Sequence, residues 1–191
     1  HCLDAKTGKR LWSVKLDGKF ASPMMYAYSD STSWTPIVDG KHVWFFNASG
    51  VMGCWDLNGK EVWKREFLAP GEPFNKQHEP ILIGDTIISL EPLDAVADAA
   101  RFEPAKKAWH YLRGIDKRTG RTLWIAEDAT TYYCTSVAGK LADGTWAILH
   151  GRGGPHDVPE RPIGLSLTSL APGKEGKTIW RYSPEDLPGG P

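Results

Sequence analysis

The chain has 191 residues, of which 41% are hydrophobic and 11% aromatic, so it can form the core of one or two ordinary domains. Lys+Arg and Asp+Glu both number 23, which excludes the basic surface of a typical nucleic-acid-binding protein. No apolar run approaches the ~18 residues of a membrane-spanning helix, and no signal peptide is visible.

Short apolar segments separated by turn-forming residues predict β-strands throughout the chain. Residues 1–20 read as the end of one repeat unit, with a strand ending at residue 4 and another over 9–16. Residues 34–67 predict the first complete unit, a meander of four antiparallel strands at 34–38, 41–47, 51–56 and 60–67. Asp39-Gly40 is a strong signal for the tight turn between the first two.

Residues 78–127 and 134–183 predict two more units, followed by a tail over 184–191. An insertion at 92–107 interrupts the first of them, and its alanine-rich part, 94–101, predicts two helical turns. Strands are expected at 78–83, 86–91, 109–116 and 121–127 in one unit, and at 134–140, 145–150, 163–169 and 177–182 in the other.

One motif recurs four times, a glycine followed four positions later by tryptophan. A basic residue follows each glycine, and a branched aliphatic residue precedes each tryptophan. The tryptophans are 51, 61 and 56 residues apart, a period typical of propellers and solenoids. In three copies an aspartate before the glycine indicates a hairpin turn. The motif residues are Asp4, Gly8, Trp12, Asp56, Gly59, Trp63, Asp116, Gly120, Trp124, Gly176 and Trp180.

A side chain as large as tryptophan, repeated at one place, most simply packs one unit against the next. We therefore expect the four motif tryptophans to be mostly buried, each on the last strand of its unit.

These residues resemble the pyrroloquinoline-quinone-like (PQQ-like) β-propeller repeat, whose hallmark is Ala-x-Asp-x-x-Thr-Gly-x-x-x-Trp, the tryptophan-docking motif. Residues 2–12 and 114–124 match it except at the first position. The resemblance implies an all-β fold over residues 1–191, a single partial β-propeller of four-stranded antiparallel blades. The rest of a full-length chain would then supply the remaining blades. It also implies a bacterial protein that is periplasmic or extracellular, at the cell surface.

Members of this family include quinone-dependent dehydrogenases and a barrel-assembly lipoprotein that binds partner proteins without a cofactor. The dehydrogenases carry two adjacent cysteines, whereas no two cysteines are adjacent here. Cys2 and Cys54 occupy the same repeat position, and we interpret them as small buried residues rather than a disulfide. The family's calcium ligands and catalytic aspartate have no matching motif, so we predict no metal and no cofactor, and catalytic residues stay unknown.

The connections between predicted strands divide between two ends of the units. Turns from first to second and from third to fourth strands share one end, and all of these are short. The long connections share the other end, at 17–33, 68–77, 92–107, 128–133 and 151–162. Loops on a rigid scaffold often carry binding or catalysis, so we expect function at the long-loop end.

The candidate ligand-binding residues of that end are His78, Glu79, His150, Arg152, His156 and Asp157. We expect them on one side of the fold, with His78 and His150 nearest the propeller axis. Imidazole and carboxylate groups suit a metal ion, and the arginine favours an anionic ligand. The alternative is a glycine-rich loop whose charges pair with one another. Trp34, Tyr132 and Tyr133 can stack on a sugar or a quinone, or pack between blades.

Two functions are consistent with this sequence. One is a binding or scaffold module that recognises a protein or glycan at the long-loop end. The alternative is part of a PQQ-dependent dehydrogenase, and only under that alternative would PQQ and calcium be expected.

Overall fold

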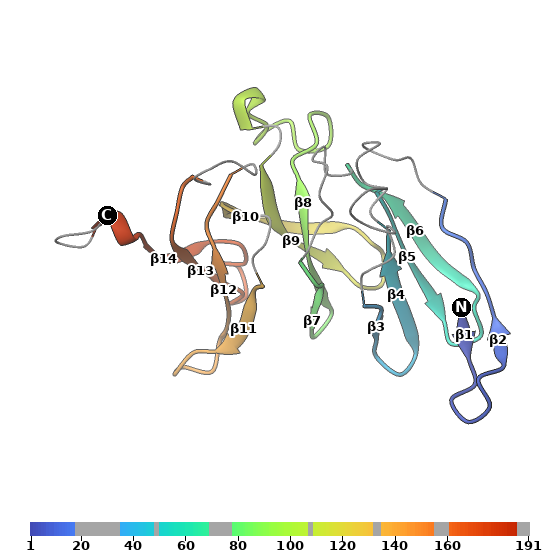
Figure 1. Ribbon diagram of the computed structural model, residues 1–191. Helices are drawn as coiled ribbons and strands as arrows, with labels where there is room; N and C mark the ends of the chain where they lie inside the picture. Colours follow the sequence, from blue (N-terminus) through green and yellow to red (C-terminus); the bar gives the residue numbers. More distant parts are fainter. Residues whose placement is uncertain are drawn as a thin grey trace.

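The structure is a computed structural model, and it describes residues 1–17, 35–47, 50–68, 78–106, 109–131, 135–154 and 161–186. These residues form one two-stranded and three four-stranded antiparallel sheets, which lie side by side in chain order (Figure 1). Two short 3-10 turns, η1 (Pro104–Lys106) and η2 (Pro184–Asp186), are the only helical segments of the described ranges. The prediction of an all-β propeller fold is confirmed.

We call the four sheets blades 1 to 4. Blade 1 contains β1 (Cys2–Leu3) and β2 (Arg10–Trp12). Blade 2 contains β3 (Ile37–Val38), β4 (His42–Phe46), β5 (Val51–Asp56) and β6 (Glu61–Glu66). Blade 3 contains β7 (Ile81–Ile83), β8 (Thr86–Pro92), β9 (His110–Asp116) and β10 (Thr122–Thr130). Blade 4 contains β11 (Val137–Lys140), β12 (Trp146–Gly151), β13 (Leu165–Ser169) and β14 (Thr178–Tyr182). Each four-stranded blade is a meander with its strands in chain order.

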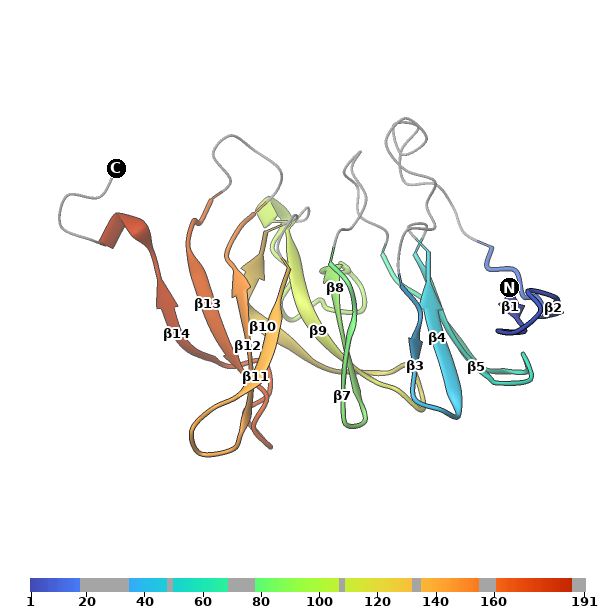
Figure 2. The same ribbon diagram turned by 60° about the horizontal axis from the view of Figure 1, so that its bottom comes forward.

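The short hairpin turns of the blades lie at one end of the molecule (Figures 1 and 2). We call it the hairpin end. Gly40, Gly84 and Gly144 make its first-to-second-strand turns with φ of 84°, 57° and 83°, a conformation that other residues rarely adopt. The insertion of blade 3 lies at the opposite end, which we call the loop end. The division into two ends thus follows from the meander connectivity.

The hydrophobic core lies between the blades rather than within one sheet. Trp44, Phe46 and Met52 of blade 2 pack with Ile87 and Ile115 of blade 3. A second cluster joins Ile88, Leu90, Leu112 and Ala126 of blade 3 to Ile148 of blade 4. Central strands are therefore covered on both faces, which explains why β5, β8 and β9 are buried along most of their length.

Three motif tryptophans contact the motif glycine of the following blade. A Cβ atom added to Gly59 would lie 2.7 Å from Trp12 Cδ2, and one added to Gly120 would lie 2.8 Å from Trp63 Cε3. Gly176 stands in the same relation to Trp124, with 3.2 Å to Cε3. The glycine both permits the turn and leaves room for the neighbouring indole, so one residue type serves two purposes in each repeat.

The expectation that the motif tryptophans are mostly buried holds for three of the four. Trp12, Trp63 and Trp124 are largely covered, whereas Trp180 is 43% exposed. Each lies on the last strand of its blade, at the outer edge, where the next hairpin covers only part of the ring. Gly120, in the next hairpin, packs against Trp63. The described residues contain no hairpin after Trp180, so they provide no equivalent contact for its ring.

Several predicted elements are shorter than the sequence suggested. β2 ends at Trp12, and β7 begins only at Ile81, after Pro80, which has no N–H to donate to the ladder. The predicted helical turns at 94–101 are instead hydrogen-bonded turns. Asp94 Oδ1 accepts the N–H groups of Val96 and Ala97, as a helix N-cap does. The backbone N–H groups of Asp98 and Phe102 donate to the carbonyl oxygens of Asp94 and Asp98, so separate turns form rather than one continuous helix.

Candidate functional site

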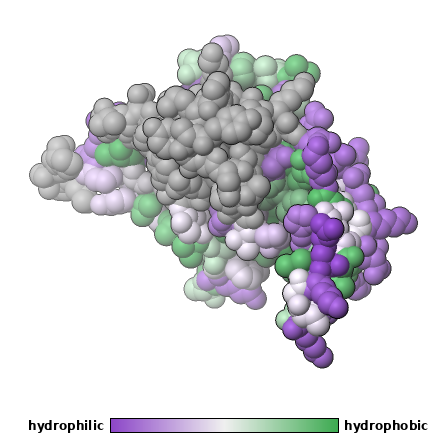
Figure 3. Space-filling view, turned by 45° about the vertical axis from the view of Figure 1, so that its right-hand side comes forward, coloured by the Kyte–Doolittle hydropathy of each residue, from purple (hydrophilic) through white to green (hydrophobic). Residues whose placement is uncertain are grey.

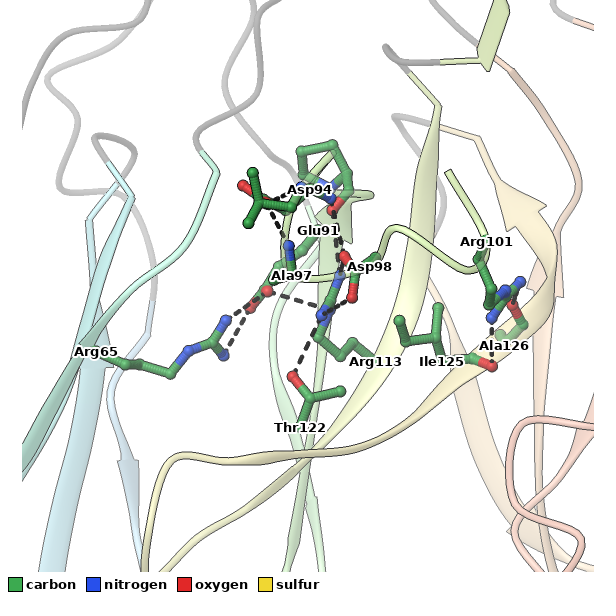
Figure 4. A network of polar contacts seen from close by, with 12 residues as sticks. Arg65, Glu91, Asp94, Ala97, Asp98, Arg101, Arg113, Thr122, Ile125 and Ala126 are labelled. Atoms are coloured by element: carbon green, nitrogen blue, oxygen red, sulfur yellow. Dashed lines mark hydrogen bonds and ion pairs between the residues drawn. The ribbon is translucent and has the colours of Figure 1, made fainter. Parts of the chain in front are cut away.

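The loop end of blade 3 holds a network of buried charges that joins two blades to the insertion (Figure 4). Glu91, at the end of β8, accepts two hydrogen bonds from Arg65 of β6, at 3.1 and 2.6 Å. Its carboxylate also lies 3.3 Å from Nε of Arg113, on β9. Arg113 in turn donates to both carboxylate oxygens of Asp98, at 3.1 and 2.7 Å. Two arginines and two acidic residues thus form a continuous chain of charge-assisted contacts, from Arg65 through Glu91 and Arg113 to Asp98.

These charges are deeply buried. The side chains of Glu91 and Arg113 are 2% and 6% exposed. Burial alone would raise the pKa of Asp98, but hydrogen bonds from Arg113 and from the backbone N–H of Asp94 bring that pKa below its usual range. Moving four charges out of water is costly, so such a network adds little net stability. Removing one partner also costs free energy, because it leaves a buried charge unpaired. Since Asp98 belongs to the insertion, the network holds the insertion in one position against blade 3.

The insertion is fastened at further points. The Asp98 side chain accepts the backbone N–H of Asp94, at 2.8 Å, which closes the first turn. Arg101 donates to the carbonyl oxygens of Ile125 and Ala126 on β10, at 2.9 and 2.7 Å. Below the insertion, Leu93 packs with Tyr111 and Ala129. Its anchors therefore reach both β9 and β10 of blade 3.

The outward surface of the insertion is made of small apolar side chains. Val96 is 88% exposed, more than any other large hydrophobic residue of the described ranges. Four alanines around it are exposed as well: Ala95, Ala97, Ala99 and Ala100. We call this surface, residues 95–100, the apolar tip. An exposed apolar surface on a firmly anchored loop is typical of a contact site for another molecule.

The described members of the predicted site are His78, Glu79, His150 and Arg152, and they lie at the same end of their sheets. Strand pairing puts His78, before β7, and His150, on β12, at the ends remote from the hairpin turns. Both side chains are buried. Glu79 Oε2 accepts the backbone N–H of Thr35, at 3.0 Å, and so links blades 2 and 3. Arg152 forms an isolated bridge with Thr130. His156 and Asp157 lie outside the described residues, as do Trp34, Tyr132 and Tyr133.

Both ring nitrogens of His150 have protein partners. Nδ1 lies 3.1 Å from Thr130 Oγ1 and 3.2 Å from the carbonyl oxygen of Gly151, and Nε2 lies 2.9 Å from Thr168 Oγ1. Burial lowers the pKa of this imidazole, which favours its neutral form. His150 therefore joins blade 3 to blade 4, and neither nitrogen is left for a metal or an anion.

Three acidic residues of the described loop end already have protein partners, which leaves them poorly suited to hold a calcium ion beside a quinone. Calcium requires six to eight oxygen ligands, many of them carboxylate. Glu91 and Asp98 are engaged by arginines, and Asp128 accepts hydrogen bonds from Ser166, Thr178 and Arg181. No group of three or more His, Cys, Asp or Glu side chains able to hold a metal occurs in the described ranges.

The network in Figure 4 was not predicted from the sequence. Its one local signal is Glu91, the one charged residue of the strand Thr86–Pro92. A buried carboxylate requires a cationic partner, but both partners are distant along the chain. In the part of the chain that the structure describes, no helix is long and apolar enough to span a membrane.

Comparisons with known proteins agree with this architecture. The family model described as outer membrane protein assembly factor BamB matches residues 1–101, slightly more than half of the chain. Curated proteins gave no match to the sequence.

Among solved structures, BamB from Moraxella catarrhalis is similar with a TM-score of 0.55 and 18% identity, over 97% of this chain and 45% of that one. A europium-containing methanol dehydrogenase has a TM-score of 0.60 and 11% identity, over 91% and 36%. Quinohemoprotein alcohol dehydrogenase from Comamonas testosteroni has a TM-score of 0.59 and 15% identity, over 98% and 32%.

The chain thus spans less than half the length of each of these structures, and at such identities the likeness concerns the fold alone. The family match, the meander blades and the repeated Gly–Trp contacts agree with one another. The chain belongs to the PQQ-like β-propeller family whose model is described as outer membrane protein assembly factor BamB.

Proposed function

We propose that this chain is part of a non-catalytic PQQ-like propeller that binds a protein partner at its loop end. The observation that carries the proposal is the apolar tip, which exposes small apolar side chains on an insertion anchored by buried charges. A contact surface that is already fixed in shape loses little conformational entropy when a partner binds. The proposal is also in line with the family's description as an assembly factor.

A protein suits this surface better than a glycan. Glycans bind to exposed aromatic platforms, whereas the tip offers alanine and valine methyl groups, which suit an apolar protein surface. We further propose that other parts of the full-length protein complete the ring, beginning with a hairpin against Trp180. A location in the periplasm or at the cell surface would match an assembly role at the outer membrane.

Site-specific photo-cross-linking tests the proposal. A benzophenone amino acid replaces Val96 in one variant of the full-length protein and Val38 in a control, and each is expressed in the source organism. Val38 is the same residue type, is also exposed and lies beside the hairpin turn at Gly40. We expect one defined protein adduct from position 96 and none from position 38. Equal adducts from both positions, or none from position 96, would refute the loop-end proposal.

The dehydrogenase alternative has a separate test. The purified protein is titrated with PQQ in the presence of Ca²⁺, and the absorbance of the quinone is followed. A scaffold should give no saturable spectral change and no oxidation of alcohols. Stoichiometric binding of PQQ together with alcohol oxidation would refute the scaffold proposal and support the dehydrogenase alternative.

A further inference from the structure

Arg65 brings blade 2 into the buried charge network that supports the insertion of blade 3 (Figure 4). It lies on β6, whereas Glu91 and Arg113 lie on β8 and β9 and Asp98 lies in the insertion itself. The Arg65 side chain is 16% exposed, and its partner Glu91 is 2% exposed. The apolar tip is therefore connected through buried charges to a neighbouring blade.

The two arginines divide the two carboxylates between them. Glu91 accepts hydrogen bonds from Arg65, at 3.1 and 2.6 Å. Arg113 Nε lies 3.3 Å from Glu91, but it forms no hydrogen bond with the residues that the structure describes. Nη1 and Nη2 of Arg113 donate to the two oxygens of Asp98, at 3.1 and 2.7 Å. Arg113 can thus face the insertion, because Arg65 supplies the hydrogen bonds to Glu91.

Asp98 shapes the first turn of the insertion. Its Oδ2 accepts the backbone N–H of Asp94 at 2.8 Å, and its own backbone N–H donates to the carbonyl oxygen of Asp94 at 2.9 Å. Asp94 Oδ1 in turn accepts the N–H groups of Val96 and Ala97, at 2.8 and 2.7 Å. A shift of Asp98 is therefore transmitted to the backbone that presents Val96.

Loss of Arg65 would leave Glu91 with one cation nearby. A buried carboxylate without a partner is costly, so Glu91 would attract Arg113. A paired bond from the side of the guanidinium uses Nε together with Nη2. Nη2 now donates to Asp98 Oδ2, so a turn of Arg113 toward Glu91 would weaken its hold on the insertion.

We propose that Arg65 is a positioning residue for the apolar tip, because its pairing with Glu91 leaves Arg113 to hold Asp98. The junction of blades 2 and 3 then regulates how firmly the tip is held. This regulation rests on the proposed function, since it alters partner binding only if the tip binds a partner. The coupling is reciprocal: a partner bound at the tip stabilises the contact between Arg65 and Glu91, and displacement of blade 2 weakens partner binding.

Hydrogen exchange followed by mass spectrometry tests the positioning role in the full-length protein without any partner. Arg65→Gln should raise exchange of peptides from 94–102 at least about tenfold, while peptides from 146–151 in blade 4 stay unchanged. The control Lys64→Gln removes a cation from the next position of the same strand, where the side chain is 50% exposed. Hydrophilic residues predominate on the side that blades 1 and 2 form (Figure 3), and the control should change exchange less than about twofold.

A double variant separates this role from a general loss of packing. In Arg65→Gln/Glu91→Gln no buried carboxylate draws Arg113 away from Asp98, so exchange at 94–102 should return to within about twofold of the wild type. Arg65→Lys keeps the charge but not the paired bonds, should raise exchange about threefold, and replaces Arg65→Gln if the latter does not fold. Circular dichroism verifies folding.

Three results would overturn the positioning role: unchanged exchange at 94–102 in the Arg65 variants, an equal rise in blade 4, or no recovery in the double variant. The cross-link at position 96 then tests the link to function. Its adduct yield should fall at least about twofold with Arg65→Gln and recover in the double variant. Loss of protection in a protein that gives no adduct even with Arg65 present would refute the proposed function and leave the positioning role standing.

Discussion

The contact between Trp63 and Gly120 can be tested by adding one methyl group. Gly120 has φ of 73°, and a Cβ atom there would lie 2.8 Å from Cε3 and 2.9 Å from Cζ3 of Trp63. Gly144 has φ of 83° in a similar turn, and a Cβ atom there meets nothing within 4 Å. Comparing Gly120→Ala with Gly144→Ala therefore separates the packing of the indole from the cost of alanine in a left-handed conformation.

Alanine in the left-handed region costs about 1–2 kcal/mol at both positions. At Gly120 the indole must also move, which adds about 1–3 kcal/mol for overpacking and strains its bond to Lys117 O. We expect losses in the free energy of unfolding of about 1 kcal/mol for Gly144→Ala and about 3 kcal/mol for Gly120→Ala. Urea unfolding followed by far-UV circular dichroism gives both values.

A double-mutant cycle completes this test. In a Trp63→Ala background the ring is gone, so Gly120→Ala should then cost only about as much as Gly144→Ala. Equal losses from the two glycine substitutions in the wild-type background would refute the idea that this contact joins blade 2 to blade 3.

Three other predictions concern buried polar groups. Glu91→Gln leaves two buried arginines without full compensation and should cost about 3 kcal/mol in urea unfolding, whereas Glu61→Gln, at an exposed ion pair, should cost under about 0.5 kcal/mol. Since the pKa of His150 is lowered on folding, the unfolded chain binds the proton more readily, and stability should fall as pH drops below about 6.5. His150→Gln should reduce this slope between pH 7 and 5, and an unchanged slope would exclude His150 as its source. Burial raises the pKa of the Cys54 thiol to about 11, so at pH 8 its alkylation, followed by peptide mass spectrometry, should be more than about 100-fold slower in the native protein than in urea.

The fold could be predicted because its signals are local and repeated. Asp116 caps its own turn through the N–H groups of Arg118 and Thr119, and Gly120 supplies the positive φ. These contacts lie within a few residues, so sequence spacing alone is sufficient to find them. The repeat of this unit then predicts stacked blades. The exposed fraction of each motif tryptophan depends on how the next blade packs against it. This packing joins residues that are distant in the sequence, so the exposed fraction could not be predicted.

The site was harder to predict because its partners are distant in sequence. His150 lies close to Arg152, His156 and Asp157 along the chain, which suggested a ligand cluster. Its side chain instead contacts Thr130 and Thr168, from strands on either side. Glu91 likewise depends on Arg65, 26 residues away. No local pattern distinguishes a histidine that binds a ligand from one that joins two blades.

Binding of the partner identified by the cross-link at position 96 is the most direct test of the proposed function. Its affinity for the full-length protein is measured by calorimetry with Val96→Asp and, as the matched control, Val38→Asp. A charge at the centre of the apolar tip should weaken binding by about 2 kcal/mol, or about 30-fold, as at other interface hot spots. The control should stay within about twofold of the wild type. Equal affinities of the two variants would contradict a docking surface at the loop end.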